Sequence, residues 1–147
     1  MRIEYLTEGH DPVPGVSLCF GSAGFVVPTT DGRLVVDTRL QLSANSTHAL
    51  MGHGVLDLLN ELPLQGRLDT GLQVVIPPAQ LESARQVFYQ ADEQTYGRSY
   101  EFAVGEAVDG VSYRIRIDNR EYQHTLSGLQ FLLRTASHDG VAAWITI

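Results

Sequence analysis

The sequence predicts an α+β fold with a mixed, mainly antiparallel sheet and about three helices. Short alternating or apolar runs, which are typical of strands, recur along the chain and are separated by turn residues. Longer segments between them repeat apolar residues at helical spacing. Strands joined by a tight turn pair antiparallel, whereas a strand reached through a helix can pair in parallel, so we expect both kinds of pairing.

The first half of the chain is predicted to contain several strands and one helix. The strands are expected at residues 2–6, 16–20, 24–27, 33–42 and 72–76, with a loop rich in proline and glycine at 9–15. Asp31-Gly32 is a strong signal for a hairpin between the third and fourth of these strands. Apolar residues at helical spacing predict a helix that Asn45 or Ser46 caps and that ends near Pro63.

The second half begins with a predicted helix. Pro77 and Pro78 stop the preceding strand and can open this helix, because its first turn does not need the N–H that proline lacks. Glu82 is well placed for the helix dipole. Further strands are expected at residues 100–104, 111–117, 121–124 and 141–147.

We expect residues 111–117 and 121–124 to form a hairpin, in which Arg116 lies opposite Glu121. Thr125 or Ser127 then caps the last helix. Gly140 suits the left-handed position after that helix. Residues 141–147 are apolar on both faces, which predicts a central strand.

The order hairpin, helix, buried strand occurs at residues 24–76 and again at 111–147, so the sequence predicts a ββαβ pseudo-repeat. Two such units could share one mixed sheet with helices on one side. A length of 147 residues fits one compact domain. We therefore expect a single α+β domain over residues 1–147, with halves at 1–78 and 79–147.

The charged residues limit the chemistry and the partners. All ten basic residues are arginine, which excludes Schiff-base chemistry and phosphate-binding loops that require lysine. The net charge of −7 disfavours direct binding to nucleic-acid phosphates and permits a basic protein partner. Cys19 is the only cysteine, so no intramolecular disulfide and no thiolate metal cluster can form.

The sequence has no apolar stretch near the roughly 20 residues of a membrane span. Glu4 interrupts the apolar run that a signal peptide would need. We therefore expect a cytoplasmic protein with no membrane partner and no cofactor.

The histidines offer only weak chemical sites. His53 and Asp57 share a helix face at i,i+4, but His48 lies off that face, so the set fits a zinc motif poorly and we expect no metal. In the predicted hairpin His124 faces the same side as Ile115, where a histidine is usually structural. His138 is explained by the dipole at a helix C-terminus.

The segment Cys19–Gly24 combines a thiol, a hydroxyl and glycines, whose backbone N–H groups could bind an anion. It lacks the sequence context of a hydrolase nucleophile. The alternative interpretation of the chain is a small enzyme or small-molecule-binding domain, with a pocket near Gly21–Gly24 and a site that uses His10 or His124 with arginine. No catalytic cluster is visible, so we assign no catalytic residue and favour a binding protein.

Carboxylates and tyrosines gather between Glu82 and Asp109, where six acids accompany two arginines. Tyrosine is enriched at protein interfaces, and carboxylates attract a basic partner. The predicted partner-binding residues are Tyr89, Asp92, Glu93, Tyr96, Tyr100, Glu101, Glu106 and Asp109. We interpret the chain as a non-enzymatic protein-binding domain of the immunity or inhibitor type that blocks a basic partner.

The strand at residues 141–147 also raises the possibility of a homo-oligomer. If it were an exposed edge, two chains could pair through it.

Overall fold

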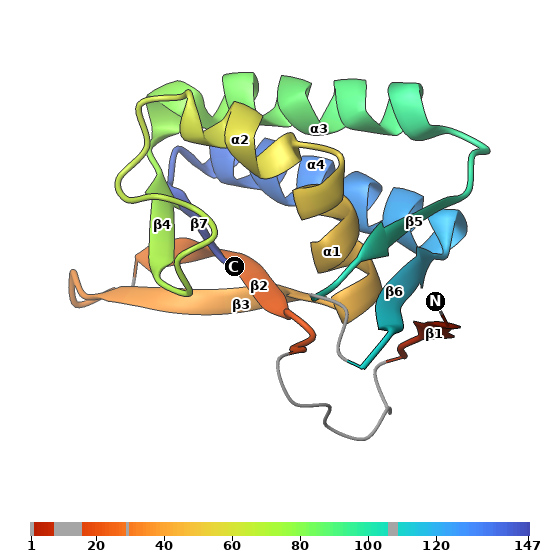
Figure 1. The fold of residues 1–147 in the computed structure, drawn as a ribbon. Helices are drawn as coiled ribbons and strands as arrows, with labels where there is room; N and C mark the ends of the chain where they lie inside the picture. The colour runs from red at the N-terminus through yellow and green to blue at the C-terminus, as the bar shows by residue number, and fades with distance from the viewer. Residues whose placement is uncertain (1, 8–15, 29, 106–108) are drawn as a thin grey trace.

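The computed structural model describes residues 2–7, 16–28, 30–105 and 109–147. Within them the chain forms an α+β fold with four α-helices and seven strands (Figure 1). The elements are β1 (Arg2–Tyr5), β2 (Gly21–Pro28), β3 (Leu34–Leu42), α1 (Ala44–Gly52), α2 (Val55–Asn60), β4 (Gln73–Ile76), a 3₁₀ turn (Pro78–Gln80), α3 (Leu81–Thr95), β5 (Tyr100–Ala103), β6 (Val111–Ile117), α4 (Asn119–Asp139) and β7 (Ala143–Thr146). The predicted fold class is confirmed. The predicted loop at residues 9–15 lies outside the described residues.

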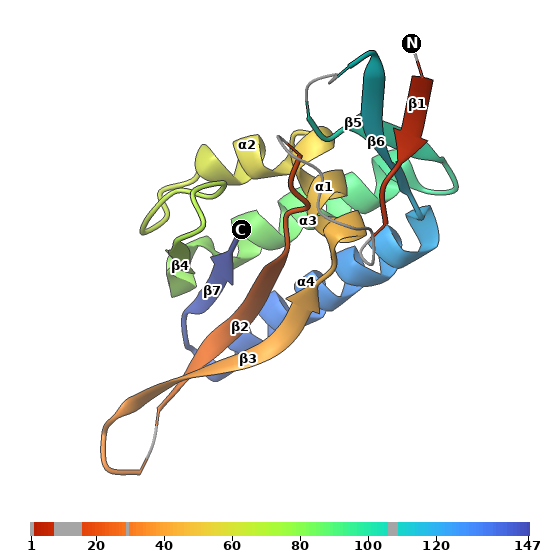
Figure 2. The same cartoon turned by 60° about the horizontal axis from the view of Figure 1, so that its bottom comes forward.

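The strands form two sheets rather than the single shared sheet that we expected. The larger sheet has the order β3-β2-β7-β4 and is antiparallel throughout. The smaller sheet has the order β1-β6-β5, in which β1 runs parallel to β6 and β5 runs antiparallel to it. Figure 2 shows the two sheets as separate groups of strands, with α1 and α4 between their ends.

The hairpin of β2 and β3 confirms the turn predicted at Asp31-Gly32, where Gly32 has a φ of 82°. The predicted strand at residues 16–20 is wrong, because only an isolated bridge between Val16 and Gly105 forms there. The backbone N–H of Cys19 instead donates to Nε2 of His48 at 3.0 Å. The His48 side chain thus accepts from a backbone N–H that would otherwise have donated to a neighbouring strand.

The predicted helix between Ser46 and Pro63 is two helices. The chain breaks after α1 because Gly54 adopts a left-handed φ of 75°, so α2 starts in a new direction. The N-cap of α1 is Ser43, whose side chain accepts a hydrogen bond from the N–H of Ser46 at 3.2 Å. The predicted caps Asn45 and Ser46 were therefore placed too late.

Asn45 and Ser46 connect α1 to α4 instead. The Asn45 side chain donates to the carbonyl of Asp118 at 3.0 Å and accepts from the N–H of Asp118 at 2.8 Å. Ser46 Oγ lies 2.7 Å from Oγ1 of Thr125, and both residues are buried. These bonds fix the start of α4 against the start of α1.

The predicted hairpin of residues 111–117 and 121–124 is wrong, because α4 already begins at Asn119. Asp118 caps it by accepting hydrogen bonds from the N–H groups of Arg120 and Glu121 at 3.1 and 3.4 Å. Thr125 and Ser127 are thus not caps. β6 pairs with β5 instead, which places Arg116 opposite Glu101 rather than Glu121.

Because α4 begins at Asn119, the second unit of the predicted pseudo-repeat, residues 111–147, lacks its hairpin. Residues 111–147 form a strand, a helix and a strand, and the order ββαβ recurs only when β5 is counted as the hairpin partner. The two strands of that hairpin then lie in the smaller sheet, whereas β7 lies in the larger one. The first unit also has two helices, α1 and α2, where the second has α4 alone, so the element order repeats only in part and the three-dimensional arrangement does not repeat.

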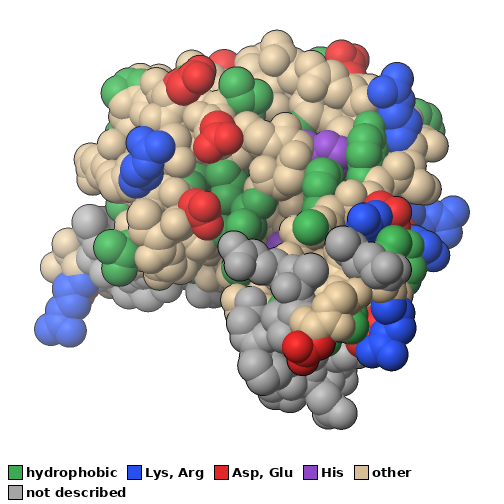
Figure 3. All heavy atoms as spheres, viewed as in Figure 1, with side chains coloured by type: hydrophobic (Ala, Val, Ile, Leu, Met, Phe, Trp, Pro, Cys, Tyr) green, Lys and Arg blue, Asp and Glu red, His purple; other side chains and the backbone are tan. Residues whose placement is uncertain are grey.

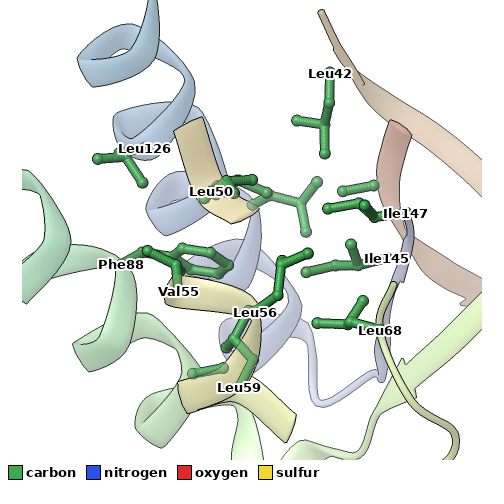
Figure 4. Packing of buried hydrophobic residues seen from close by; sticks show 14 of the residues in the cluster. Leu42, Leu50, Val55, Leu56, Leu59, Leu68, Phe88, Leu126, Ile145 and Ile147 are labelled. Carbon is green, nitrogen blue, oxygen red and sulfur yellow. The ribbon is translucent and has the colours of Figure 1, made fainter. Parts of the chain in front are cut away.

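One hydrophobic cluster takes buried residues from both halves of the chain. In Figure 4 its side chains project from the helices and from the larger sheet toward one another. The residues labelled there are Leu42, Leu50, Val55, Leu56, Leu59, Leu68, Phe88, Leu126, Ile145 and Ile147. Tyr122 on α4 is also fully buried.

The strand predicted at residues 141–147 is central, as expected, because β7 lies between β2 and β4. It is therefore not an edge through which two chains could pair. Its end is fixed by the Ile147 carbonyl oxygen, which accepts from the N–H groups of Asp69, Thr70 and Gly71 at 3.1, 3.2 and 3.0 Å. Gly140 adopts the predicted left-handed conformation, with a φ of 67°.

We predict opposite effects for alanine at two helical glycines. A Cβ on Gly52 would lie 2.6 Å from the ring of Phe102, whereas a Cβ on Gly128 would make an ordinary contact of 3.5 Å with Leu40. Gly52→Ala should therefore lower the free energy of unfolding by about 1–3 kcal/mol. Gly128→Ala should raise it by up to about 1 kcal/mol, because alanine favours the helix.

Urea denaturation followed by circular dichroism measures both changes. Equal effects at the two positions would show that the contact with Phe102 does not restrict Gly52.

Candidate protein-binding surface

The structure distributes the predicted partner-binding residues over α3, β5 and the turn before β6. Tyr89, Asp92 and Glu93 lie in the second half of α3, and Tyr96 follows its last residue. Tyr100 and Glu101 lie on β5, and Asp109 lies before β6 with a φ of 51°. Glu106 lies outside the described residues. Figure 1 shows that α3 leads into β5 at one end of the molecule.

The end of α3 presents two exposed tyrosines. The side chain of Tyr89 is 44% exposed and that of Tyr96 is 76% exposed. The Tyr89 hydroxyl donates to Oε1 of Glu93 at 2.7 Å, and this bond raises the pKa of Tyr89. The phenol thus stays neutral and is held in one orientation beside a carboxylate.

Ion pairs neutralise part of the predicted acidic surface. Glu101 lies 3.5 Å from Arg114 and 3.9 Å from Arg116. Glu82 lies 2.6 Å from Arg85, and the hydrogen bond from Arg85 holds the pKa of Glu82 at about 2. Among the described residues of this stretch, the carboxylates without an ion pair are those of Asp92, Glu93 and Asp109.

Tyr100 faces inward, toward His53 at the end of α1. The ring centroids of these residues are 4.2 Å apart in an edge-on arrangement, and the Phe102 ring lies 5.2 Å from His53. The ring of Tyr122 stacks on His53, with the ring centroids 5.4 Å apart. Three aromatic residues therefore surround one imidazole, which the sequence did not indicate because Tyr122 was predicted on a strand.

Several polar atoms of these rings and of residues on α3 and α4 are buried without a hydrogen-bond partner. They are Nε2 of His53, Oδ1 of Asp92, the hydroxyl of Tyr122, Oδ1 of Asn119 and Nε2 of Gln123. Burial lowers the pKa of His53 and raises the pKa of Asp92. Burial also raises the pKa of Tyr122, and the charge of Asp92 raises it further. His53 is thus held neutral in a region with unused hydrogen-bonding capacity.

A pocket of about 250 Å³ opens beside His53, between α2, α3 and β5. One part of its lining is apolar and includes Val55, Leu58 and Val87. The other part is polar: His53, Gln90, Gln94, Thr95, Arg98 and Tyr100. Gln90 and Gln94 directly follow Tyr89 and Glu93 along α3, so one wall of the pocket is next to these two residues on the helix.

The histidines proposed for metal or catalysis do not come together. His48 is buried and accepts a backbone hydrogen bond, whereas His53 stacks among aromatic rings and Asp57 is exposed on α2. Among the described residues, no group of three His, Cys, Asp or Glu side chains could hold a metal ion. His124 is exposed on α4 rather than placed beside Ile115, and His10 lies outside the described residues.

The segment Gly21–Gly24 forms part of β2, between β3 and β7. A Cβ on Gly21 would lie 2.7 Å from the carbonyl oxygen of Thr146, so the strand is closely packed where we expected a pocket. Burial raises the pKa of the Cys19 thiol, and the charge of Asp69 raises it further. A protonated thiol is a poor nucleophile, which weighs against a catalytic role for Cys19.

Comparisons with known proteins give one partial match. The chain is 33% identical over 91 residues to a protein of Pseudomonas putida named Curved DNA-binding protein, a match that covers 59% of this chain and 28% of that protein. The chain therefore spans less than a third of the length of this relative. No family model and no solved structure matches the chain. In the described residues, no helix is long and apolar enough to span a membrane.

We predict that the buried His48 and the half-buried His53 make stability depend on pH. Burial lowers the pKa of His48 and of His53 below the ordinary value of 6.5. Each neutral imidazole therefore contributes stability above pH 6.5 that is lost as the pH falls through the lower pKa of the folded state. The free energy of unfolding should decrease from pH 7 toward about pH 5.

Urea denaturation across this pH range measures the slope, and His48→Gln should reduce it. His138→Gln, which removes an exposed histidine, is the matched control. The prediction fails if the slope of the His48→Gln variant equals that of the unsubstituted chain.

Proposed function

We propose that this chain is a non-enzymatic protein-binding domain that captures a basic partner, in the manner of an immunity or inhibitor protein. The observation that carries the proposal is the arrangement of Tyr89, Glu93 and Tyr96 at the end of α3. Two exposed tyrosines lie there with a carboxylate that has no ion pair in the described part of the chain. Such residues give a partner large apolar contacts together with charge attraction.

The hydrogen bond between Tyr89 and Glu93 prepares this surface for binding. Glu93 accepts from the tyrosine through Oε1, and its second oxygen can accept a charge-assisted bond from an arginine or lysine of the partner. The phenol ring beside it can pack against the aliphatic part of the same side chain. Because the pair is already oriented, less side-chain entropy is lost on binding.

The pocket beside His53 supplies an anchor point next to this surface. Its polar lining and the unpartnered Nε2 of His53 suit a side chain that carries a hydroxyl or an amide. Arg98 lines the same pocket and repels a basic group, so we assign the partner's basic residues to Glu93 and an uncharged polar residue to the pocket. Anchoring side chains in such pockets often dominate the affinity of an interface.

Substitution of Tyr89 and Glu93 tests the proposal. Proteins captured from a lysate of the source organism by the unsubstituted chain are identified, and the complex with the purified partner is measured by calorimetry. Tyr89→Ala with Glu93→Arg should weaken that complex by about tenfold or more. The affinity should also fall as salt is added, because screening weakens the charge attraction.

Glu61→Arg is the matched control, because it makes the same charge change at an exposed position after α2. A partner that binds the Tyr89/Glu93 variant as tightly as the unsubstituted chain would contradict the proposal.

The partial match to Curved DNA-binding protein favours DNA binding as a second candidate function. The charge of this chain opposes it, since DNA affinity depends on clustered basic side chains. In Figure 3 the arginines on the face viewed are interspersed with acidic side chains and do not form one basic patch.

Gel retardation of bent and straight duplexes of equal length distinguishes the two functions. A protein-binding domain with a net charge of −7 should retard neither duplex at physiological salt. Preferential retardation of the bent duplex would support DNA binding and contradict our expectation that the chain has no direct nucleic-acid partner.

A further inference from the structure

An apolar groove runs between β3 and α4, outside the surface described above. A cavity of about 510 Å³ is lined by Phe25, Leu40, Gly128, Phe131, Leu132, Thr135 and Asp139. A second cavity, of about 470 Å³, is lined by Leu40, Gln41, Ser43, Glu121, His124, Thr125, Ser127, Gly128 and Phe131. The two share Leu40, Gly128 and Phe131, so they form one continuous depression. Figure 2 shows β3 and α4 running beside each other here.

The centre of the groove combines an exposed aromatic ring with a missing side chain. Phe131 is 71% exposed, although phenylalanine is usually buried. Gly128 lies inside the 21-residue helix α4, where glycine costs about 1 kcal/mol relative to alanine. A Cβ on Gly128 would make only an ordinary contact of 3.5 Å with Leu40, so internal packing does not require glycine. What glycine provides is room in the groove.

The backbone of β3 offers hydrogen bonds along the same groove. β3 is nine residues long and is the outermost strand of the larger sheet, with β2 on one side and no strand of the described chain on the other. The opposite edge of this sheet is partly covered, because Gln65 exchanges two backbone hydrogen bonds with Val75 of β4 at 2.9 and 3.0 Å. An unpaired strand edge accepts an extended segment as an additional strand.

The lining of the groove carries negative charge toward both ends. Glu121 lines the end near the start of α4 and Asp139 lines the end near its last residue, about 27 Å away along the helix. Neither carboxylate has an ion pair in the described part of the chain. The arginines of α4, Arg120 and Arg134, are not among the lining residues.

We infer that β3 and the groove beside it bind an extended segment of a protein partner, with apolar side chains in its centre and arginine or lysine toward its ends. The backbone of this segment pairs with β3, its apolar side chains occupy the space above Gly128 beside Phe131, and its basic residues lie near Glu121 and Asp139. A second copy of this chain is disfavoured as the occupant, since each copy carries a net charge of −7. This site shares no residue with the α3 surface, and its occupation does not require that surface to bind.

A displayed library of random peptides, each of about twelve residues and thus long enough to span β3, provides the probe. The full chain is panned at low salt, and the selected peptides are synthesised with a fluorescent label for anisotropy measurements. We expect the selected sequences to alternate apolar residues and to carry arginine or lysine near their ends. Hydrogen exchange of the β3 amides should slow when such a peptide binds.

Substitutions in the groove decide whether these peptides bind there. Gly128→Leu fills the groove with a good helix former and should weaken binding by about tenfold or more. Gly128→Ala adds one methyl group at the same position and should weaken binding by a smaller factor than Gly128→Leu. Phe131→Ala, at an exposed position, provides a second variant if Gly128→Leu does not fold. Glu121→Gln with Asp139→Asn should remove most of the salt dependence.

Three results would overturn the inference. The first is that no peptide is enriched. The second is that the enriched peptides bind the folded Gly128→Leu and Phe131→Ala variants as tightly as the unsubstituted chain. The third is that the free chain dimerises with the β3 amides protected, which would make a second copy the occupant. Peptide binding that persists in the Tyr89→Ala, Glu93→Arg variant would separate this site from the α3 surface.

Discussion

The paired hydrogen bonds between the Asn45 side chain and the backbone of Asp118 hold the structure at its central junction. Asp118 follows the last residue of β6, caps α4, and both donates to and accepts from the Asn45 side chain, so one buried amide sets where the strand stops and where the helix begins. The contact between Ser46 and Thr125 fixes the rotation of α4 about two turns further on. With the start and rotation of α4 fixed, Tyr122 lies against His53 and Gly128 lies opposite Leu40.

The two binding surfaces that we propose depend on this junction in different ways. The pocket beside His53 lies at the bend between α1 and α2, where Gly54 is left-handed, and Tyr122 of α4 stacks on the same imidazole. The groove exists because α4 passes beside the outermost strand and presents a glycine there. Both regions carry features that cost stability, namely unpartnered buried polar atoms in one and a mid-helix glycine with an exposed phenylalanine in the other.

The distribution of charge over the surface depends on the three-dimensional fold and not on the order of residues in the sequence alone. Glu82 and Glu101 belong to one acidic stretch of the sequence, yet arginines neutralise both. Glu121 was predicted to pair with Arg116 across a hairpin, and it instead lines the groove on α4. Arg85 pairs with Glu82 one helical turn away on α3, whereas strand register brings Arg114 and Arg116 beside Glu101. A run of acidic residues in a sequence therefore overestimates the charge that a partner meets.

The sequence by itself determined the fold class, the hairpin turn at Asp31-Gly32, the end of α4 at Gly140 and the burial of β7. It also placed a break at Pro77 and Pro78, although these prolines open a 3₁₀ turn and α3 begins only at Leu81. Each of these follows from local chemistry: left-handed glycine, proline without an N–H, or a run of apolar side chains. The helical start at residues 119–124 also has a local cause, because Asp118 caps it with Glu121 three residues later, but the strand-like alternation of residues 121–124 obscured that signal. Tertiary structure alone decided which strands pair and which side chains line the pocket and the groove, because those contacts join residues far apart in the chain, such as Asn45 and Asp118.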